Sequence, residues 1–258
     1  GVFLGATFGS MLQQIERAAE GRVLHLTGPS GAGKEVAARA FHEKSIVAKR
    51  PFVAINCAAI PEGVAERVLF GAKKGSFSGA HADATGHLQE ADGGTLFLDE
   101  VAELDLQVQG KLLRAIEARE IIPLGASRPV PIDVRFCSAT HRDLRQAVAD
   151  KTFREDLYFR IGRPVIAVPS LAERREEIAF LVDREVRTVG LLSDASLIET
   201  CLLRPWPGNV RELIVEVSAA ARAASAAGDA RVTARDLAPN AGMPLGKGRS
   251  SAVSQLTP

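Results

Sequence analysis

The stretch LTGPSGAGKE near the amino terminus has the residue types and spacing of a phosphate-binding loop. Gly28, Gly33 and Lys34 stand in the order G-x-x-x-x-G-K, directly after the apolar run VLHL and before a helical pattern. Glycines let the backbone N–H groups of such a loop converge on an anion, and the lysine reaches the β- and γ-phosphates of a nucleotide. A glycine-rich turn before a chance lysine is the competing interpretation, but it does not account for strand, loop and helix in this order.

We therefore expect ATP as the ligand of this loop and Mg²⁺ as its companion. The expected nucleotide-binding residues are Gly28, Pro29, Ser30, Gly31, Ala32, Gly33, Lys34 and Glu35. Glu35 stands where a Ser or Thr would normally offer its hydroxyl to magnesium. The metal is therefore expected to be held mainly by other groups.

The run GGTLFLDE predicts a buried strand that ends in two acids, Asp99 and Glu100. Ligands of an open parallel sheet lie at the carboxyl ends of its strands. Asp99 is suited to hold Mg²⁺, directly or through water, and Glu100 to orient and polarise the water that attacks the γ-phosphate. A solvated acidic turn would explain the two acids alone, but not their combination with the loop at Gly28.

Apolar runs separated by helical patterns predict an α/β fold with a parallel sheet covered by helices on both faces. A helix is expected from Ser10 to Glu20 and another over 108–117. The expected strands are Val23–Leu26, Phe52–Ile55, Thr95–Leu98, Val134–Cys137 and Val165–Val168.

Beyond Pro169 the pattern becomes helical, with helices expected over 172–189, 195–203, 210–227 and 234–237. The residues after Leu237 carry Pro, Gly and Ser with little apolar periodicity, which is typical of a flexible segment. We expect an α/β nucleotide-binding domain over 1–170, a small helical lid domain over 171–238 and a flexible tail over 239–258.

Composition excludes several classes of protein. Lys and Arg number 32 against 31 Asp and Glu, so no bulk charge marks a polyanion or membrane partner. Cys57, Cys137 and Cys201 are odd in number and far apart, which argues against a disulfide framework and fits a reducing compartment. No apolar run approaches the length of about 18 residues that spans a bilayer, and no leader is expected. We expect a cytoplasmic protein without membrane association.

Seven stretches resemble, in order, the AAA+ central domain of bacterial enhancer-binding proteins, the activators of sigma-54 RNA polymerase. They are GPSGAGKE, FVAINCAAI, LFGAKKGSFSGA, GGTLFLDEVAEL, SATHRDL, FREDLYFRI and WPGNVREL, and the resemblance as a whole covers nearly everything from about Leu4 to Leu237. The resemblance implies a three-layer AAA+ P-loop domain with a helical lid, ATP hydrolysis, and a ring for which a hexamer is expected. It also implies remodelling of the sigma-54 RNA polymerase closed promoter complex. Glu after the loop lysine is usual in this family.

The most diagnostic stretch resembles the family's GAFTGA loop, which touches sigma-54 when nucleotide is bound. It consists of Gly75, Ser76, Phe77, Ser78, Gly79 and Ala80, within a contact loop of about residues 71–82. An aromatic residue between glycines is a poor core element but a good mobile tip. Two positions of this loop differ from the common form, since Ser76 replaces Ala and Ser78 replaces Thr. Lys73 stands where the family commonly has Glu, and we expect this change to alter how the loop is held in place.

Three arginines acquire roles from the resemblance. Arg154 and Arg160 match the paired arginines that reach into the neighbouring subunit's nucleotide site, where such a group is worth about 10³ to 10⁵ in rate. Alone, their segment indicates only an amphipathic helix with surface ion pairs. Arg211 matches the sensor II arginine that reports nucleotide state to the lid, and Trp206 is expected to pack between the domains.

Other positions match the family as well. Asn56 corresponds to the residue that switches the position of the catalytic glutamate, here Glu100. Thr140 and His141 fall at sensor I, where many members have Asn in place of His141. The segment 120–133 resembles the second pore-facing hairpin. The remaining histidines have no metal-ligand spacing and are expected to be structural or at the surface: His25, His42, His81 and His87.

The sequence leaves two alternatives open. One is a nucleotide-dependent regulatory ring that no longer contacts sigma-54, and the changes at Ser76 and Ser78 favour it. The other is a general AAA+ remodeller or replication ATPase, and the stretches GSFSGA and WPGNVREL argue against it. Family members often carry a sensory domain and a helix-turn-helix, so DNA binding is expected only through domains absent from this chain.

Overall fold

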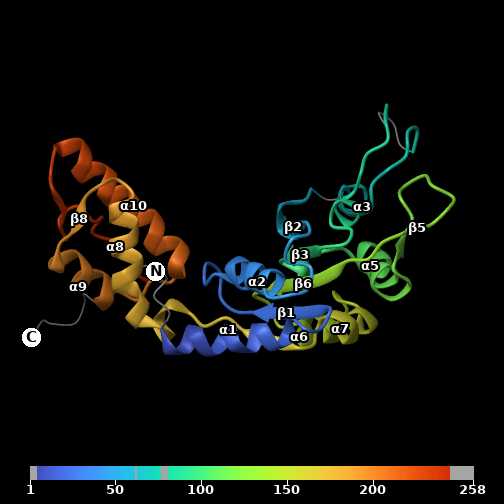
Figure 1. The fold of residues 1–258 in the computed structure, drawn as a ribbon, viewed down its shortest axis with the longest axis horizontal. Coiled ribbons are helices and arrows are strands. Elements are labelled where there is room, and N and C mark those ends of the chain that lie inside the picture. The colour runs from blue at the N-terminus through green and yellow to red at the C-terminus, as the bar shows by residue number, and fades with distance from the viewer. Residues whose placement is uncertain (1–4, 62, 77–80, 245–258) are drawn as a thin grey trace, which may run out of the picture. The chain divides into compact units, whose positions relative to one another are not determined.

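The computed structural model describes residues 5–61, 63–76 and 81–244, and the chain divides into two compact units (Figure 1). We call Ala6–Pro169 the sheet unit. Of the described residues, the helical unit contains Gly5 and residues 170–244. Each unit encloses its own hydrophobic core, with two clusters in the sheet unit and one in the helical unit.

The sheet unit is built on five parallel strands in the order β2-β3-β6-β1-β7. Because all five run in the same direction, their carboxyl ends lie along one edge of the sheet, and the predicted parallel sheet is confirmed. The strands are β1 (Val23–Thr27), β2 (Phe52–Asn56), β3 (Thr95–Asp99), β6 (Arg135–Thr140) and β7 (Val165–Ala167).

Helices cover both faces of this sheet. Successive side chains of β3 alternate between the faces, since Leu96 and Leu98 belong to one core cluster and Phe97 to the other. The cluster around Phe97 also includes the apolar sides of the first two helices, whereas α3 and α5 pack on the opposite cluster. The helices are α1 (Ala6–Ala18), α2 (Lys34–Glu43), α3 (Ala65–Phe70), α4 (His87–Glu90), α5 (Leu106–Ala118), α6 (Leu144–Ala149) and α7 (Glu155–Ile161).

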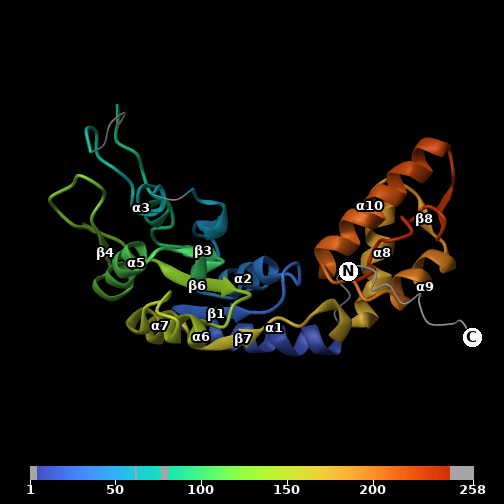
Figure 2. The same ribbon diagram turned by 180° about the vertical axis from the view of Figure 1, so that it is seen from behind.

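A short antiparallel hairpin, β4 (Glu120–Ile121) with β5 (Val130–Pro131), lies within the segment expected to form one. Figures 1 and 2 both show this hairpin beside the stem of the loop that follows α3. Backbone bridges join the two, because Ala72 pairs with Ala84 on one side and with Leu124 on the other.

The helical unit contains α8 (Ile178–Arg187), α9 (Ala195–Leu203), α10 (Asn209–Ala227) and a two-residue parallel pair of β8 (Leu192–Ser193) with β9 (Arg231–Val232). The predicted helix over 172–189 is wrong at its amino end, where two 3-10 turns precede α8. Glu173 accepts hydrogen bonds from the backbone and hydroxyl of Ser170, and Arg174 then takes a non-helical conformation.

The helix expected over 234–237 is also wrong. Thr233 and Asp236 close a turn there, because the Asp236 carboxylate accepts hydrogen bonds from the N–H and the hydroxyl of Thr233. Side-chain acceptors of this kind compete with a helix for backbone donors.

Trp206 lies in the core of the helical unit and donates its indole N–H to the carbonyl of Cys201 at 2.7 Å. Residues 239–244, assigned above to a tail, pack on the same unit. Ala241 is buried, and Gly242 accepts a hydrogen bond from the Trp206 N–H while donating one to Glu212.

The three cysteines are buried and free. In the described part of the chain, none of the helices combines the length and the apolar character that crossing a bilayer requires.

Candidate nucleotide site

The loop between β1 and α2 depends on glycine at its two ends. A Cβ atom at Gly28 would lie 2.6 Å from the carbonyl oxygen of Val168, so the loop passes the residue after β7 too closely for any side chain. Gly33 has φ 103° and immediately precedes α2, which begins at Lys34. The loop thus delivers the amino end of a ten-residue helix to the carboxyl edge of the sheet.

Between these glycines, Pro29 and Ser30 are exposed, Gly31 has φ 74° and Ala32 is buried. The expected residues 28–33 thus form one continuous loop, and Lys34 and Glu35 are the first two residues of α2.

Lys34 is buried and its ammonium group lies across the loop. Nζ donates to the carbonyl oxygens of Gly28 at 3.1 Å and Pro29 at 3.4 Å. It also lies 3.8 Å from Oε1 of Glu100. A cation confined between the loop and an acid is placed to meet a phosphate bound by the loop.

Asp99 and Glu100 leave β3 at the same edge. Asp99 Oδ1 accepts the Glu100 N–H at 3.1 Å. Glu100 itself has φ 53° and ψ 48°, a left-handed conformation that non-glycine residues adopt at a cost. Such strain is found mainly at functional sites, where surrounding contacts maintain it.

One oxygen of Glu100 receives three donors from the end of β6. Oε2 lies 3.2 Å from the Thr140 hydroxyl, 3.3 Å from the His141 backbone nitrogen and 2.7 Å from His141 Nδ1. Burial raises the pKa of Glu100, but the hydrogen bonds from His141 and the charge of Lys34 lower this pKa by more than burial raises it. The pKa of Glu100 is therefore below its ordinary value and the carboxylate is ionised.

Asn56 is the neighbour of Asp99 in the register of β2 and β3. Its side-chain oxygen accepts the N–H of Ala58 at 3.0 Å and so caps the short turn that follows β2. The structure thus brings Asn56 to the correct edge of the sheet, and its switching role stays a prediction.

The acids at this edge fit a magnesium ion held largely by phosphate oxygens. No group of three His, Cys, Asp or Glu side chains within the described residues could enclose a metal. Magnesium commonly uses one or two carboxylates together with substrate phosphates and water. Asp99 is the candidate ligand, since the Glu35 carboxylate pairs at 2.8 Å with Arg39 on the exposed side of α2.

The predicted finger arginines are exposed around α7 and paired within the chain. Arg154 makes two hydrogen bonds to Asp156, at 3.0 and 2.7 Å. Arg160 lies 3.1 Å from Glu117 of α5. Arg211 is an exposed residue of α10 in the helical unit. The roles of all three remain predictions.

The stem of the contact loop is held by an ion pair as well as by the backbone. Asp83 accepts hydrogen bonds from Lys73 Nζ at 2.6 Å and from the Lys74 N–H at 2.8 Å. Gly75 and Ser76 belong to the described part of this loop. The predicted contact residues Phe77, Ser78, Gly79 and Ala80 lie outside the described residues.

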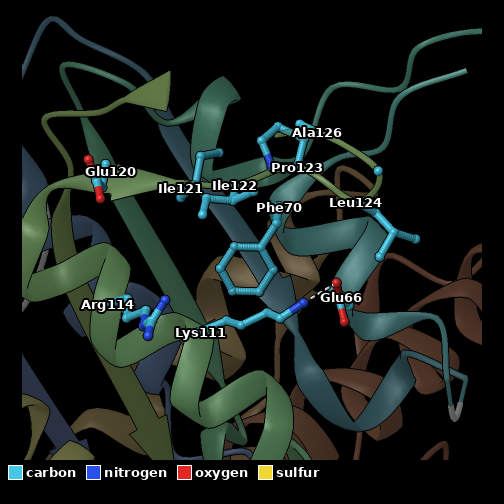
Figure 3. A pocket seen from close by; sticks show the side chains of 11 residues that line it. Glu66, Phe70, Lys111, Arg114, Glu120, Ile121, Ile122, Pro123, Leu124 and Ala126 are labelled. Atoms are coloured by element: carbon cyan, nitrogen blue, oxygen red, sulfur yellow. Dashed lines mark hydrogen bonds and ion pairs between the residues drawn. The ribbon is translucent and has the colours of Figure 1, made fainter. Parts of the chain in front are cut away.

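A hollow of about 290 Å³ lies beneath this stem, between α3, α5 and the hairpin (Figure 3). Figure 3 shows the Phe70 ring between the hairpin residues and the ion pair of Lys111 with Glu66. Leu124 lines the hollow and also exchanges backbone hydrogen bonds with Gly71 and Lys73. Leu124 therefore connects the lining of the hollow to the loop stem through its backbone.

The sequence did not reveal two of these interactions. His141 was placed at sensor I, but its contact with Glu100 depends on the pairing of β3 with β6. The pair of Lys73 with Asp83 joins residues across the loop, and only the opposite charges of these residues could have suggested it.

A glycine-rich loop after β1, an acid pair at the end of β3 and polar residues at the end of β6 lie at one edge of a five-stranded parallel sheet. Together they define an AAA+ P-loop nucleotide-binding fold. A family model described as the sigma-54 interaction domain matches residues 5–167. The chain belongs to this family.

Relatives agree with this assignment. The chain is 47% identical over 195 residues to the transcriptional regulatory protein FlbD of Caulobacter vibrioides, covering 73% of this chain and 43% of FlbD. It is 42% identical over 214 residues to the transcriptional regulatory protein GlrR of Escherichia coli, covering 79% of this chain and 48% of GlrR. The chain spans between 33% and 67% of the length of the first three curated relatives it matches.

Among solved structures, NtrX from Brucella abortus in complex with ADP is similar, with a TM-score of 0.84 and 34% identity over 97% of this chain and 58% of NtrX. The same protein has also been crystallised in complex with ATP. The RuvB branch migration motor of Thermotoga maritima, at 16% identity, 88% coverage of this chain, 65% of RuvB and a TM-score of 0.59, shares the fold alone.

Proposed function

We propose that this chain is an ATP-hydrolysing AAA+ module that assembles into a ring and remodels the sigma-54 RNA polymerase closed promoter complex. The observation that carries the hydrolytic part is the meeting of Lys34, Glu100 and Thr140 at one edge of the sheet. A cation from the phosphate loop, an ionised carboxylate and a strand-end hydroxyl there supply the groups that hydrolysis of a γ-phosphate needs.

Each residue has one task in this proposal. Glu100 orients a water molecule and draws its proton as the water oxygen bonds to the γ-phosphorus and the bond to the bridging oxygen of ADP breaks. Lys34 balances negative charge on the phosphates. Asp99 would hold Mg²⁺, which neutralises phosphate charge when bound.

The ring completes the site in this proposal. Arg154 and Arg160 are exposed on the sheet unit and pair with Asp156 and Glu117. Surface ion pairs of this kind cost little to break, so both guanidinium groups are available to a neighbouring copy of the chain. An arginine from the neighbour would stabilise charge in the transition state. Hydrolysis would then require assembly.

Turnover of ATP tests the hydrolytic part. Glu100→Gln is expected to lower kcat by about 10² to 10⁴ while leaving ATP binding intact, because the amide cannot take up a proton. Glu103→Gln is the matched control, since Glu103 pairs with Arg142 at 2.7 Å in the turn that follows. Equal turnover by Glu100→Gln and the wild-type protein would contradict the proposal.

Capture of purified sigma-54 tests the remodelling part. The chain is incubated with ADP and a γ-phosphate transition-state mimic, and Phe77→Ala serves as the control. Capture that requires the mimic and Phe77 supports the activator role. Turnover of ATP without capture would favour the regulatory ring that has lost sigma-54 contact.

A further inference from the structure

We infer that His141 is a positioning residue that fixes the carboxylate of Glu100 for hydrolysis. This inference rests on the proposed ATP hydrolysis. It assigns to His141 a task within the protein, directed at Glu100 rather than at a phosphate.

The shortest hydrogen bond of the Glu100 side chain is the one to His141. His141 Nδ1 lies 2.7 Å from Oε2, and the backbone N–H of His141 approaches the same oxygen at 3.3 Å. An ionised carboxylate only accepts hydrogen bonds, so this contact places a proton on Nδ1. One residue thus supplies a side-chain donor and a backbone donor to a single oxygen.

The two oxygens of Glu100 therefore differ. Oε2 is held at the end of β6, whereas Oε1 faces the phosphate loop, 3.8 Å from Lys34 Nζ. Fixing one oxygen sets the direction of the other. A general base must present its oxygen to the water in a defined orientation, and a misplacement of about 1 Å can cost about 10² in rate.

Other groups near Glu100 are less suited to this task. Within the described residues, the Asn56 side chain forms its hydrogen bond in the cap after β2, by accepting the N–H of Ala58, and forms none with Glu100. The Thr140 hydroxyl lies farther from Oε2, at 3.2 Å, and also accepts the N–H of Arg142 at 3.1 Å. The strained φ of Glu100 fixes its backbone, so the remaining freedom is in the side chain that His141 holds.

Substitutions at His141 can separate its two ring nitrogens. The amide nitrogen of Asn stands as many bonds from Cβ as Nδ1 does, so His141→Asn keeps the donor to Glu100. The amide nitrogen of Gln corresponds instead to Nε2, so His141→Gln misplaces that donor. His141→Ala removes it.

We expect His141→Asn to keep kcat within a few-fold of wild type, and His141→Gln and His141→Ala to lower kcat by about 10- to 100-fold. The KM for ATP and the affinity for a fluorescent ATP analogue should stay within about twofold of wild type in all three variants, because ground-state binding is unchanged. Thermal unfolding with and without ATP controls for folding.

A cycle with Glu100→Gln tests whether His141 acts through Glu100. Adding His141→Ala to Glu100→Gln should lower the residual turnover no further, since the two residues act as a unit. Wild-type kcat in His141→Ala, or additive losses in the double variant, would overturn the inference and leave the proposed function standing. So would loss of ATP affinity in His141→Ala with rescue by Gln, which would indicate a phosphate contact through Nε2. A wild-type protein that binds ATP without turnover, alone and in its ring, would overturn the proposed function and the inference together.

Discussion

Glu100 combines a left-handed backbone with a side chain held by donors from another strand. The backbone turn directs the carboxylate away from the path of β3, toward Lys34 and the end of β6. Hydrogen bonds and the nearby cation offset the cost of burying its charge. The same contacts that keep Glu100 ionised therefore also set its direction, which a general base requires.

His25 provides a pH-dependent test of the sheet unit at the residue scale. It is buried on β1, 2.8 Å from the hydroxyl of its cross-strand neighbour Ser138, and burial lowers the pKa of His25 to about 4. The unfolded chain binds the proton near pH 6.5, so between pH 6.5 and 4 the unfolded state carries more protons. Stability is full above pH 6.5 and falls toward pH 4, by about 3 kcal/mol in all from this group.

Urea unfolding followed by circular dichroism from pH 7.5 to 4 would measure this loss. His25→Asn removes the titrating group and is expected to flatten the pH dependence relative to wild type. His87→Gln is the control, because His87 pairs with Glu90 and is partly exposed. An unchanged slope in His25→Asn would contradict the assignment.

At the scale of elements, the loop stem and hairpin behave as one structure. The ion pair of Lys73 with Asp83 closes the stem below the contact loop, and Leu124 ties the stem to the hairpin. We call the ion pair of Lys73 with Asp83 the latch. Hydrogen bonds from Lys73 and Lys74 lower the pKa of Asp83, so the Asp83 carboxylate is charged at neutral pH. The pair is exposed, and its effect is therefore expected to be modest.

Reversing one charge of this latch is expected to weaken mimic-dependent sigma-54 capture a few-fold, because like charges then face each other across the stem. Lys73→Asp and Asp83→Lys are the single variants. The doubly swapped protein should recover capture, and rising salt should reduce the difference between variants. Equal capture by all variants at low salt would exclude a latching role.

The helical unit offers a second test at this scale, in the packing of Gly242 on Trp206. Gly242 has φ 67°, and a Cβ there would lie 2.7 Å from the indole ring. Gly242→Ala is expected to cost roughly 1–2 kcal/mol for the left-handed backbone and about 1–3 kcal/mol more for the clash. Gly190→Ala isolates the first cost, since Gly190 has φ 79° and open space around its Cβ position.

Urea unfolding followed by the fluorescence of Trp206, the single tryptophan of the chain, reports on both variants. A larger loss for Gly242→Ala than for Gly190→Ala is expected. Equal losses of stability would mean that the Trp206 indole ring moves aside without a measurable cost in free energy.

The elements themselves were largely predictable, because apolar periodicity and glycine placement act locally. The helix expected over 195–203 coincides with α9, and the acid pair of Asp99 and Glu100 stands at the carboxyl end of β3 as expected. The misses arise from side chains that compete with a helix, as Asp236 does by accepting donors from Thr233. The anchor of Glu100 could not be predicted, because strand pairing brings His141 to it.

At the scale of the whole molecule, the two units carry separate spectroscopic and chemical reporters. Trp206 and Cys201 belong to the core of the helical unit, whereas Cys57 and Cys137 belong to the cores of the sheet unit. Burial raises the pKa of Cys57 to about 12 and that of Cys201 to about 11, so neither thiol reacts in the folded chain. Labelling of Cys57 and Cys137 therefore reports unfolding of the sheet unit, and labelling of Cys201 reports unfolding of the helical unit.

ATP with Mg²⁺ should raise the urea midpoint for labelling of Cys57 and Cys137, because a ligand that binds only the folded phosphate loop stabilises it, by about 2.7 kcal/mol at a hundred times Kd. The expected role of Arg211 adds a second condition. If Arg211 contacts nucleotide, the Trp206 transition must shift with ATP as well, since binding energy then reaches the helical unit.

Arg211→Ala should then cancel the ATP-dependent shift at Trp206 while leaving that at Cys57 and Cys137 nearly intact. Lys34→Ala should cancel both, because it removes a phosphate contact of the loop itself. Arg204→Ala is a control within the helical unit, since Arg204 binds the carbonyls of Ala238 and Ala241. A Trp206 transition that ignores ATP in the wild-type protein would rule out the sensor II assignment, and nucleotide recognition would then belong to the sheet unit alone.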